Sequence, residues 1–155
     1  MEGIIKAVCI SKEKGTPKSD IGQCELIEDY GLENDAHAGK WHRQVSLLSW
    51  DKVEEYRNSF GDNYNEIIKD GAFGENLLVA GIDVAKLPLG TAIYAGDAVL
   101  EITQVGKECH SGCVIAKTTG KCIMPTEGVF ARVITGGIVK TGDSVKIEYP
   151  KTENI

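Results

Sequence analysis

Residues 90–105 read GTAIYAGDAVLEITQV and decide the fold class of this chain. Two strand-like runs, TAIYA at 91–95 and AVLEITQV at 98–105, flank Gly96-Asp97, a dipeptide typical of the tight turn in a β-hairpin. A similar pattern follows at 136–145, GGIVKTGDSV, where five residues again separate a glycine from a Gly-Asp pair. Two copies of one hairpin pattern predict a barrel or sandwich built from hairpins, with one hairpin at the C-terminal end.

Most of the remaining chain also reads as short strands joined by polar turns. These further strands are predicted at 3–10, 24–31, 45–49, 76–81, 129–137, 138–142 and 143–149. A helix is predicted at 50–58, because Ser49 can cap it and Trp50, Val53 and Tyr56 recur at helical spacing. Shorter helices are predicted at 62–71 and around 110–118. We expect a single domain over residues 1–155, mainly β with short helices, whose antiparallel strands form a closed or partly open, α/β barrel-like fold.

Composition narrows the class of partner. The 155 residues are 42% apolar and 26% charged, a balance typical of a globular domain. A formal net charge of −6 argues against nucleic acid and anionic membranes as partners, because both attract basic proteins. No apolar run reaches the roughly 18 to 20 residues of a membrane span, and the N-terminus lacks a secretory signal. We therefore expect a cytoplasmic protein.

The cysteines carry the clearest chemical signal. Their number, five, is odd, which disfavours a disulfide framework in a cytoplasmic chain. Cys109, Cys113 and Cys122 lie within fourteen residues, beside His110. Such thiolates can bind zinc, copper, an iron–sulfur cluster or molybdenum, or carry a persulfide sulfur, and burial as small apolar residues is the alternative. Structural zinc sites prefer two Cys or Cys/His pairs, and here one pair lacks its partner.

Two further polar segments could line a site. The loop at 34–43, NDAHAGKWHR, contains Asp35, His37 and Arg43, which could polarise a ligand or bind a phosphate, or simply form a surface loop. Glu75 and Asn76 follow a glycine at the start of a predicted strand. The chain contains no G-x-G-x-x-G, Walker, G-x-S-x-G or H-E-x-x-H motif, so the corresponding nucleotide, hydrolase and zincin chemistries lack support.

Several segments together resemble a MOSC domain of the small bacterial type that is associated with molybdenum cofactor synthesis. GLENDAHAGKWHRQVSLLS resembles the family's Gly…Asp-x-His…Arg-x-Val-Ser stretch, and GAFGENL resembles its Phe-Gly-Glu-Asn element. LPLGTAIYAGDAVLEITQVGKECHSGC is similar to its hairpin leading into a cysteine, and VFARVITGGIVKTGD completes the likeness. The resemblance covers nearly the whole chain.

This resemblance implies a β-barrel-like fold, a molybdopterin pocket and one thiolate that holds the metal or carries sulfur. The favoured thiolate is Cys113, because the apolar residues after it resemble the family's run, and Cys109 is the alternative. The resemblance and the charges together predict the cofactor-binding set as Asp35, His37, Arg43, Glu75, Asn76, Lys107, His110 and Arg132. Loop 34–43, turn 74–76 and segment 107–113 are expected to converge on one cleft.

Three functions follow from this interpretation. The leading one is a molybdenum cofactor-binding or sulfur-carrier protein, which would need a separate sulfur source such as a cysteine desulfurase and would serve a molybdoenzyme acceptor. The second is a molybdenum-dependent reductase of N-hydroxylated substrates, which needs a separate electron donor. The third is a structural zinc module in which Cys109, Cys113, Cys122 and a histidine bind the metal.

Overall fold

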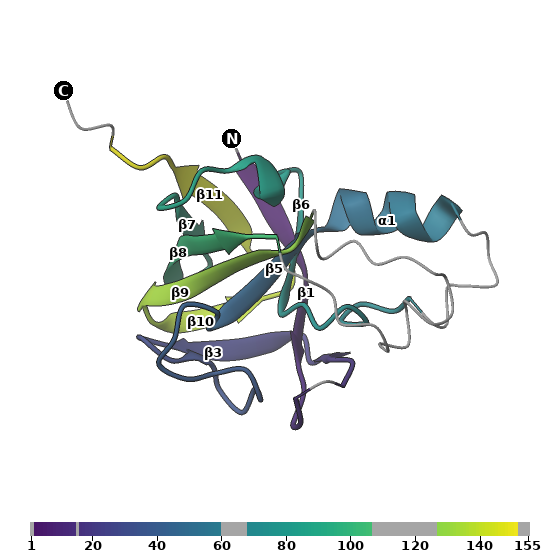
Figure 1. Ribbon diagram of the computed structural model, residues 1–155, viewed down its shortest axis with the longest axis horizontal. Helices are drawn as coiled ribbons and strands as arrows, with labels where there is room; N and C mark the ends of the chain where they lie inside the picture. The colour runs from purple at the N-terminus through teal and green to yellow at the C-terminus, as the bar shows by residue number, and fades with distance from the viewer. Residues whose placement is uncertain (1, 15, 60–67, 107–126, 152–155) are drawn as a thin grey trace.

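Strands dominate the described part of the chain (Figure 1), which comprises residues 2–14, 16–59, 68–106 and 127–151 of a computed structural model. The elements are β1 (Glu2–Ile10), β2 (Ser19–Asp20), β3 (Gln23–Ile27), β4 (Gly31–Leu32), β5 (Val45–Ser49), α1 (Trp50–Ser59), β6 (Leu77–Ala80), the 3-10 helix η2 (Val84–Lys86), β7 (Ala92–Ala95), β8 (Ala98–Val105), β9 (Val129–Thr135), β10 (Gly137–Lys140) and β11 (Ser144–Glu148).

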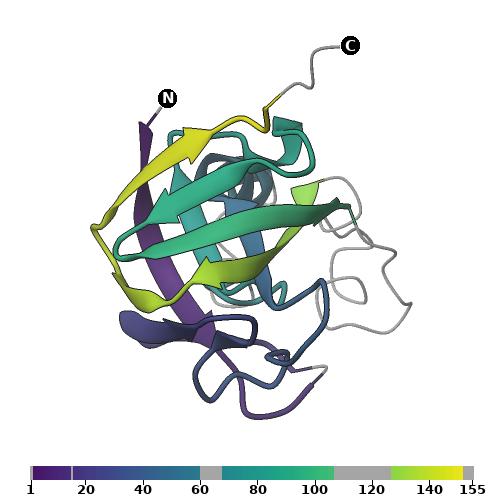
Figure 2. The ribbon, with the colours of Figure 1, turned by 90° about the vertical axis from the view of Figure 1, so that its left-hand side faces the viewer.

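Seven of the described strands close a barrel. They are hydrogen-bonded in the order β11, β7, β8, β9, β5, β6, β1, and a further pairing of β1 with β11 closes the ring. The β7–β8 hairpin turns at Gly96-Asp97 and pairs Ala95 with Ala98, as its sequence predicts. In Figure 2 this hairpin lies between β9 and β11. The predicted mainly antiparallel barrel is confirmed.

The predicted terminal hairpin is wrong. Gly142-Asp143 does form a tight turn, in which the Asp143 amide donates to the carbonyl of Lys140 at 3.0 Å. The two strands beside this turn enter different sheets, because both edges of β11 are already paired, with β1 and with β7. Strand β10 instead pairs with β3, and β3 with β4, in a separate three-stranded sheet. The second Gly-Asp pattern is thus a corner between sheets.

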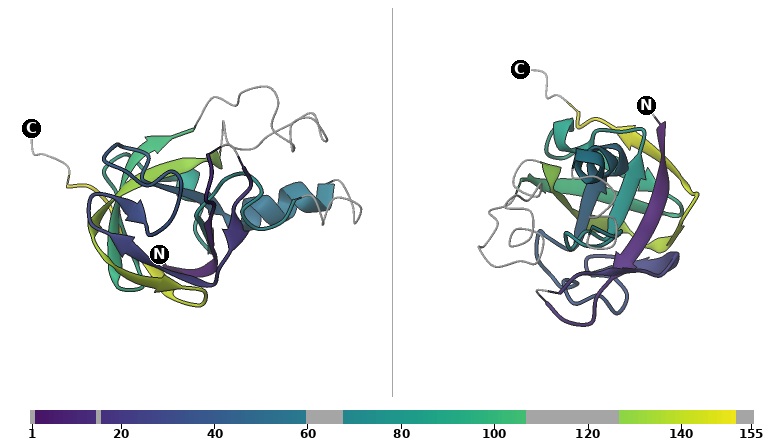
Figure 3. Two further views of the ribbon diagram at one scale, coloured as in Figure 1. Left: turned by 90° about the horizontal axis from the view of Figure 1, so that it is seen from below. Right: turned by 90° about the vertical axis from the view of Figure 1, so that its right-hand side faces the viewer.

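One pair of barrel strands is parallel, and α1 lies in the connection between them. Strands β5 and β6 run parallel, with Leu47 opposite Leu77, and a parallel pair needs a crossover connection. Figure 1 shows α1 beside the barrel, and the right panel of Figure 3 shows the helix end-on. Val53 and Tyr56 are buried between α1 and the barrel with Leu48 and Leu78. The predicted helix at 50–58 is confirmed.

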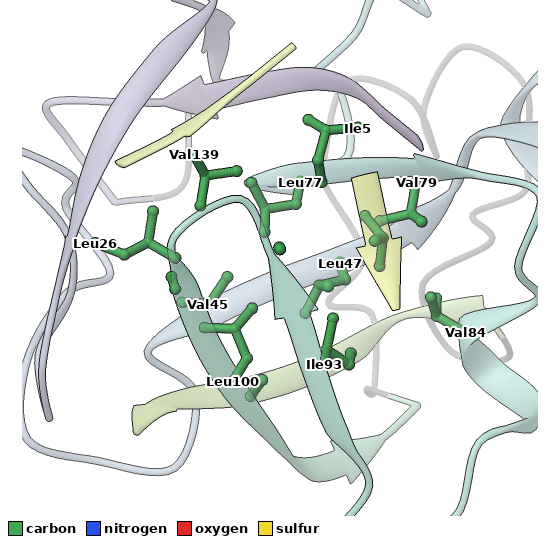
Figure 4. Close-up of a cluster of buried hydrophobic side chains, with 14 of the residues drawn as sticks. Ile5, Leu26, Val45, Leu47, Leu77, Val79, Val84, Ile93, Leu100 and Val139 are labelled. Atoms are coloured by element: carbon green, nitrogen blue, oxygen red, sulfur yellow. The ribbon is translucent and has the colours of Figure 1, made fainter. Parts of the chain in front are cut away.

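The main core fills the barrel (Figure 4). Side chains from the barrel strands meet those of β3 and β10, and Leu26, Leu47, Leu77, Ile93 and Leu100 are almost fully buried there. Strand β8 illustrates how a strand contributes to this core. Its residues from Ala98 to Ile102 alternate between buried and partly exposed positions, so one face of the strand is apolar and faces the core. The two cores fix the strand ends on which the polar loops described below are built.

Two predicted helices cannot be compared with the structure in full. The one around 110–118 lies outside the described residues, and of the one at 62–71 only 68–71 are described, where the chain forms a bend and a turn. The single domain over 1–155 stays a prediction. In the described ranges, we find no helix with the length and hydropathy of a membrane span.

Candidate functional site

A buried lysine organises the first half of loop 34–43. Lys18 follows the loop after β1, and its side chain is 0% exposed. Its ammonium Nζ lies 2.7 Å from Oδ1 of Asp35, 3.1 Å from Oγ of Ser11 and 2.9 Å from Nδ1 of His37. The Asp35 carboxylate also accepts the amides of Ser11 (3.1 Å) and His37 (3.3 Å). The predicted residues Asp35 and His37 therefore do lie together, around a cation that the sequence analysis did not single out.

The ion pair decides what this cluster can do chemically. A buried carboxylate at 2.7 Å keeps Lys18 as an ammonium, because either charge without the other would be left unpaired away from water. Ser11 donates its own proton to the carbonyl of Glu13 at 3.1 Å. Lys18 therefore has no lone pair with which to deprotonate Ser11, and the cluster is not a Ser–Lys nucleophile. It holds loop 34–43 in place.

Glu75 stabilises the turn that precedes β6, and the backbone of this turn also contacts Lys18. Its carboxylate is fully buried and accepts the amides of Gly71 at 2.8 Å and Phe73 at 3.0 Å. Burial raises the pKa of Glu75 to about 7, although these amide bonds act in the opposite direction. Gly71 in turn accepts the amide of Lys18 at 2.9 Å, and it has a φ of +92° and would place a Cβ 2.2 Å from the Lys18 carbonyl oxygen. Glycine is therefore required at this position.

Asn76 joins three strands. Its amide group donates to the carbonyl of Cys9 at 3.0 Å and accepts the amide of Ser46 at 2.9 Å, so it ties β1 to β5 at the start of β6. Both Asn76 and Glu75 are 0% exposed, and their side chains are occupied by backbone groups. The structure thus gives these two predicted site residues local structural contacts. Their predicted role in binding a cofactor stays a proposal.

Gln104 holds the second half of loop 34–43. Its side-chain oxygen lies 3.0 Å from Nε of Arg43 and 2.9 Å from Nε2 of His42, and its amide nitrogen donates to the carbonyl of Gly106 at 2.8 Å. The Arg43 guanidinium also lies over the ring of Phe130, 5.2 Å from its centroid. The loop is therefore anchored at both ends, by Lys18 at one and by the end of β8 at the other.

The cysteine-containing segment leaves the barrel at this same point. The amide of Gly106 donates to the carbonyl of Gly128 at 2.6 Å, so the two residues that flank segment 107–127 are in contact. Gln104, which bonds Arg43 and His42, is two residues from that contact. The anchored loop 34–43 and the base of the cysteine segment are therefore neighbours.

A surface cavity of about 340 Å³ lies on this face. Its lining residues are Asp29, Lys40, Trp41, His42, Glu101, Thr103 and Arg132. The Trp41 indole is 41% exposed and donates to the carbonyl of His37 at 2.8 Å, which links the cavity wall to the Lys18 cluster. Arg132 is half exposed and pairs with Glu101 at 3.2 Å. The volume falls in the range of small-ligand sites, and the lining combines cations, carboxylates and one aromatic face.

The predicted thiolates Cys109, Cys113 and Cys122 lie outside the described part of the chain, and so do the predicted cofactor-binding residues Lys107 and His110. The other two cysteines, Cys9 and Cys24, are buried, and burial raises the pKa of both thiols. Among the described residues, no group of three or more His, Cys, Asp or Glu side chains is arranged to hold a metal ion. A thiolate site therefore stays a prediction for segment 107–126.

Sequence analysis missed Lys18, Gln104 and the cavity residues around Lys40. Lys18 is one of three lysines in the polar stretch at 11–20, and no local pattern separates it from the other two. Gln104 does carry a signal, because it is a polar residue at the end of a hairpin strand that leads directly into the cysteines. Strand ends of this kind are favoured places for sites.

The chain is similar to one known protein family and to several solved structures. The MOSC domain family matches residues 34–146, and no curated protein matches. The YuaD protein from Bacillus subtilis has a similar structure, with a TM-score of 0.77 and 18% identity over 97% of this chain and 98% of that one. YiiM from Escherichia coli gives a TM-score of 0.67 at 20% identity, over 99% of this chain and 72% of that one. YiiM from Geobacillus stearothermophilus gives 0.70 at 18%, over 94% and 75%.

At these identities the solved structures show a shared fold, and the family follows from the sequence match. That match covers more than half of the chain, including the anchored loop, the β7–β8 hairpin and the cysteine segment. The protein belongs to the MOSC domain family, which is associated with molybdenum cofactor proteins.

Proposed function

We propose that this protein binds the molybdenum cofactor in the cavity between loop 34–43 and β8, and that Cys113 supplies the thiolate, with Cys109 as the alternative. The contact between Gly106 and Gly128 is the observation that carries the proposal. It brings the two residues that flank the cysteine segment beside Gln104, whose side chain also contacts His42 and Arg43. Any ligand bound in this cavity would therefore lie next to the base of the segment that contains the thiols.

The cavity residues fit the chemistry of this cofactor. A molybdopterin carries a phosphate, a planar pterin ring with N–H donors, and sulfur ligands for the metal. Lys40 and Arg132 would bind the phosphate, since cations beside a cavity attract an anion. The carboxylates of Asp29 and Glu101 would accept the pterin donors, and the exposed Trp41 indole offers a face for the ring.

Charge supports the same interpretation. The whole chain has a net charge of −6, so an anionic ligand needs a local excess of positive charge. Lys40 and Arg132 line the cavity and Arg43 is anchored behind it, against the two carboxylates Asp29 and Glu101. Lys40 forms no ion pair with any described residue, which leaves its ammonium available to a ligand.

When bound, the cofactor supplies a redox-active metal, and the residues of this chain hold and orient it. In this proposal the thiolate binds molybdenum. A sulfur-carrier role is the alternative, and the experiment below distinguishes it from metal binding. In that role the thiolate would attack the terminal sulfur of a desulfurase persulfide. The donor S–S bond would break, and the donor would leave as a thiolate. The partner would then be that desulfurase, together with a molybdoenzyme acceptor.

Reconstitution tests the proposal. Metal-free protein is mixed with molybdenum cofactor, and bound molybdenum and bound pterin are each measured per chain. Replacing Lys40 and Arg132 together by glutamine should weaken binding roughly 100-fold, because each change removes a charge-assisted hydrogen bond worth roughly 1.5 kcal/mol. Lys146→Gln is the matched control, since this exposed lysine lies outside the cavity and pairs only weakly with Glu2 at 3.5 Å.

The cysteine variants separate the roles of the thiolates. Cys113→Ala should lose molybdenum, and Cys109→Ala should keep it. The opposite pattern would transfer the role to Cys109. If both variants retain molybdenum and intact mass analysis detects a persulfide on the wild type, the thiolate acts as a sulfur carrier and not as a metal ligand. Equal cofactor binding by the double glutamine variant and the Lys146→Gln control would contradict the assigned cavity.

A further inference from the structure

The side-chain amide of Gln104 has a single orientation that satisfies its neighbours. Its nitrogen lies 2.8 Å from the carbonyl oxygen of Gly106, which can only accept. Its oxygen Oε1 lies 3.0 Å from Nε of Arg43, which can only donate. Exchanging the nitrogen and the oxygen would set a donor against Arg43 and an acceptor against Gly106. Oε1 is therefore the atom that contacts loop 34–43.

This orientation fixes a proton on the ring of His42. Nε2 of His42 lies 2.9 Å from the same Oε1, so Nε2 carries a proton and donates it. The carbonyl oxygen of Gln104 has two lone pairs, one for Arg43 and one for His42. A neutral imidazole with its proton on Nε2 keeps a lone pair on Nδ1, and this second nitrogen can only accept.

The contacts of His42 place its ring at the surface cavity of about 340 Å³. The hydroxyl of Thr103 donates to the carbonyl of His42, and the Trp41 ring contacts the His42 ring edge to face, with centroids 5.9 Å apart. All three residues line the cavity. His42 is exposed, and its Nδ1 has no hydrogen bond to any described residue. This nitrogen is therefore available to a ligand.

We propose that Gln104 is a positioning residue that holds His42 as its Nε2–H tautomer, so that Nδ1 of His42 binds a ligand of the cavity as a hydrogen-bond acceptor. The ligand group at this point is an N–H or O–H donor, such as a ring N–H of a pterin. Lys40 and Arg132 can only donate, so His42 recognises a different part of the ligand from theirs. The ligand role rests on the proposed function, whereas the tautomer rests only on the contacts of Gln104.

Nuclear magnetic resonance of the cofactor-free protein tests the tautomer. Long-range proton–nitrogen spectra of protein labelled with ¹⁵N-histidine distinguish the Nε2–H, Nδ1–H and imidazolium forms, and the His42 signals are those that His42→Asn lacks. At about pH 8, where an ordinary histidine is neutral, the wild type should show a protonated Nε2 and an unprotonated Nδ1. A protonated Nδ1 at this pH would overturn the proposal.

Variants of Gln104 test whether this residue sets the tautomer. Gln104→Leu removes the acceptor, so the two ring nitrogens of His42 should show chemical shifts averaged between both tautomers. Gln104→Glu keeps an acceptor oxygen and should keep the Nε2–H form. Gln23→Leu is the control, because Gln23 is an exposed strand residue outside the cavity lining, and its His42 spectrum should match that of the wild type. A pure Nε2–H signal in Gln104→Leu would overturn the role of Gln104.

The ligand role has its own measurement, which is cofactor binding by two replacements of His42. The side-chain oxygen of asparagine can occupy the position of Nδ1, so His42→Asn keeps the acceptor. Glutamine reaches to the position of Nε2, so His42→Gln keeps the donor to Gln104 and loses the acceptor. His42→Gln should bind the cofactor about fivefold more weakly than His42→Asn, which corresponds to one neutral hydrogen bond of about 1 kcal/mol. Equal binding by the two variants would refute the acceptor role.

The pH dependence of binding separates this role from the opposite one, in which His42 acts as a cation. An imidazolium cannot accept, so the ratio of wild-type to His42→Asn affinity should fall from about pH 8 to about pH 5. The ratio isolates His42, because both proteins keep the other charged groups of this face, namely Asp29, Lys40, Arg43, Glu101 and Arg132. A ratio that stays constant or rises would overturn the ligand role. If the wild type binds no cofactor, the proposed function fails, and the cofactor-free spectra still decide the role of Gln104.

Discussion

Glu75 gives the sharpest prediction about stability, because it is a fully buried carboxylate that contacts no cation among the described residues. It accepts the amides of Gly71 and Phe73 in the turn before β6. Burial raises its pKa from 4.5 to about 7. Replacing it by glutamine keeps one acceptor oxygen and places an NH₂ group against the second amide. Below pH 4.5, where Glu75 is protonated in both the folded and the unfolded state, the variant should therefore be about 1 to 3 kcal/mol less stable than the wild type, the usual cost of an unsatisfied buried group.

The pH dependence of the unfolding free energy tests the assigned pKa of Glu75. Between pH 4.5 and 7 the folded protein holds a proton on Glu75 that the unfolded chain has released. The free energy of unfolding contributed by this group is therefore fully present below pH 4.5 and is lost as the pH rises to 7. A pKa change of about 2.5 units corresponds to about 3 kcal/mol. Glu75→Gln has no such proton, so this part of the pH dependence should vanish.

Urea denaturation from pH 4 to 8 measures the difference in unfolding free energy between wild type and Glu75→Gln. The wild type should lose about 3 kcal/mol relative to the variant across this range. Glu2→Gln, which removes an exposed carboxylate, corrects for the change in net charge. A difference between wild type and Glu75→Gln that stays constant from pH 4.5 to 7 would refute the reasoning, since it would mean that burial does not govern this carboxylate.

Three further results are expected. Lys18→Met and Asp35→Asn should each cost about 3 to 5 kcal/mol in urea denaturation, and the double variant should cost less than their sum, because each single change leaves a buried charge unpaired; additive losses would argue against the pair. Leu100→Ala in the barrel core should cost about 2 to 5 kcal/mol, whereas Leu89→Ala, at a 60% exposed position, should change stability by less than about 0.5 kcal/mol. Limiting iodoacetamide should label the cysteines of segment 107–126 before the two buried ones, because burial disfavours the thiolate, and peptide mapping that finds the reverse order would contradict a reactive thiol in that segment.

The strands and α1 were predictable from sequence because their signals are local. Alternation of apolar residues identifies β8, and the Gly96-Asp97 turn identifies the β7–β8 hairpin, so the barrel class followed from one stretch of sixteen residues. The corner between β10 and β11 was not predictable in this way. Its Gly142-Asp143 turn looks like the first one, but partner choice depends on β1 and β7, which occupy both edges of β11.

The candidate site was likewise predictable only where its sequence signal is local. Loop 34–43 stood out by its own polar residues, and the structure does place Asp35 and His37 together. Their organising residue, Lys18, was missed because its burial depends on partners that are distant in sequence: Asp35, 17 residues away, and the backbone of Gly71. Glu75 illustrates the converse, because a carboxylate beside glycine reads as a ligand in sequence, while the fold encloses it completely.

Direct analysis of the purified protein tests the central claim, that this chain binds the molybdenum cofactor beside its cysteine segment. The protein is isolated from a host that makes the cofactor, and its molybdenum and pterin contents are measured together. We predict that both are present in equal amounts, and that both fall when Lys40 and Arg132 are replaced by glutamine while Lys146→Gln leaves them unchanged. Wild-type protein that carries neither molybdenum nor pterin would contradict the account.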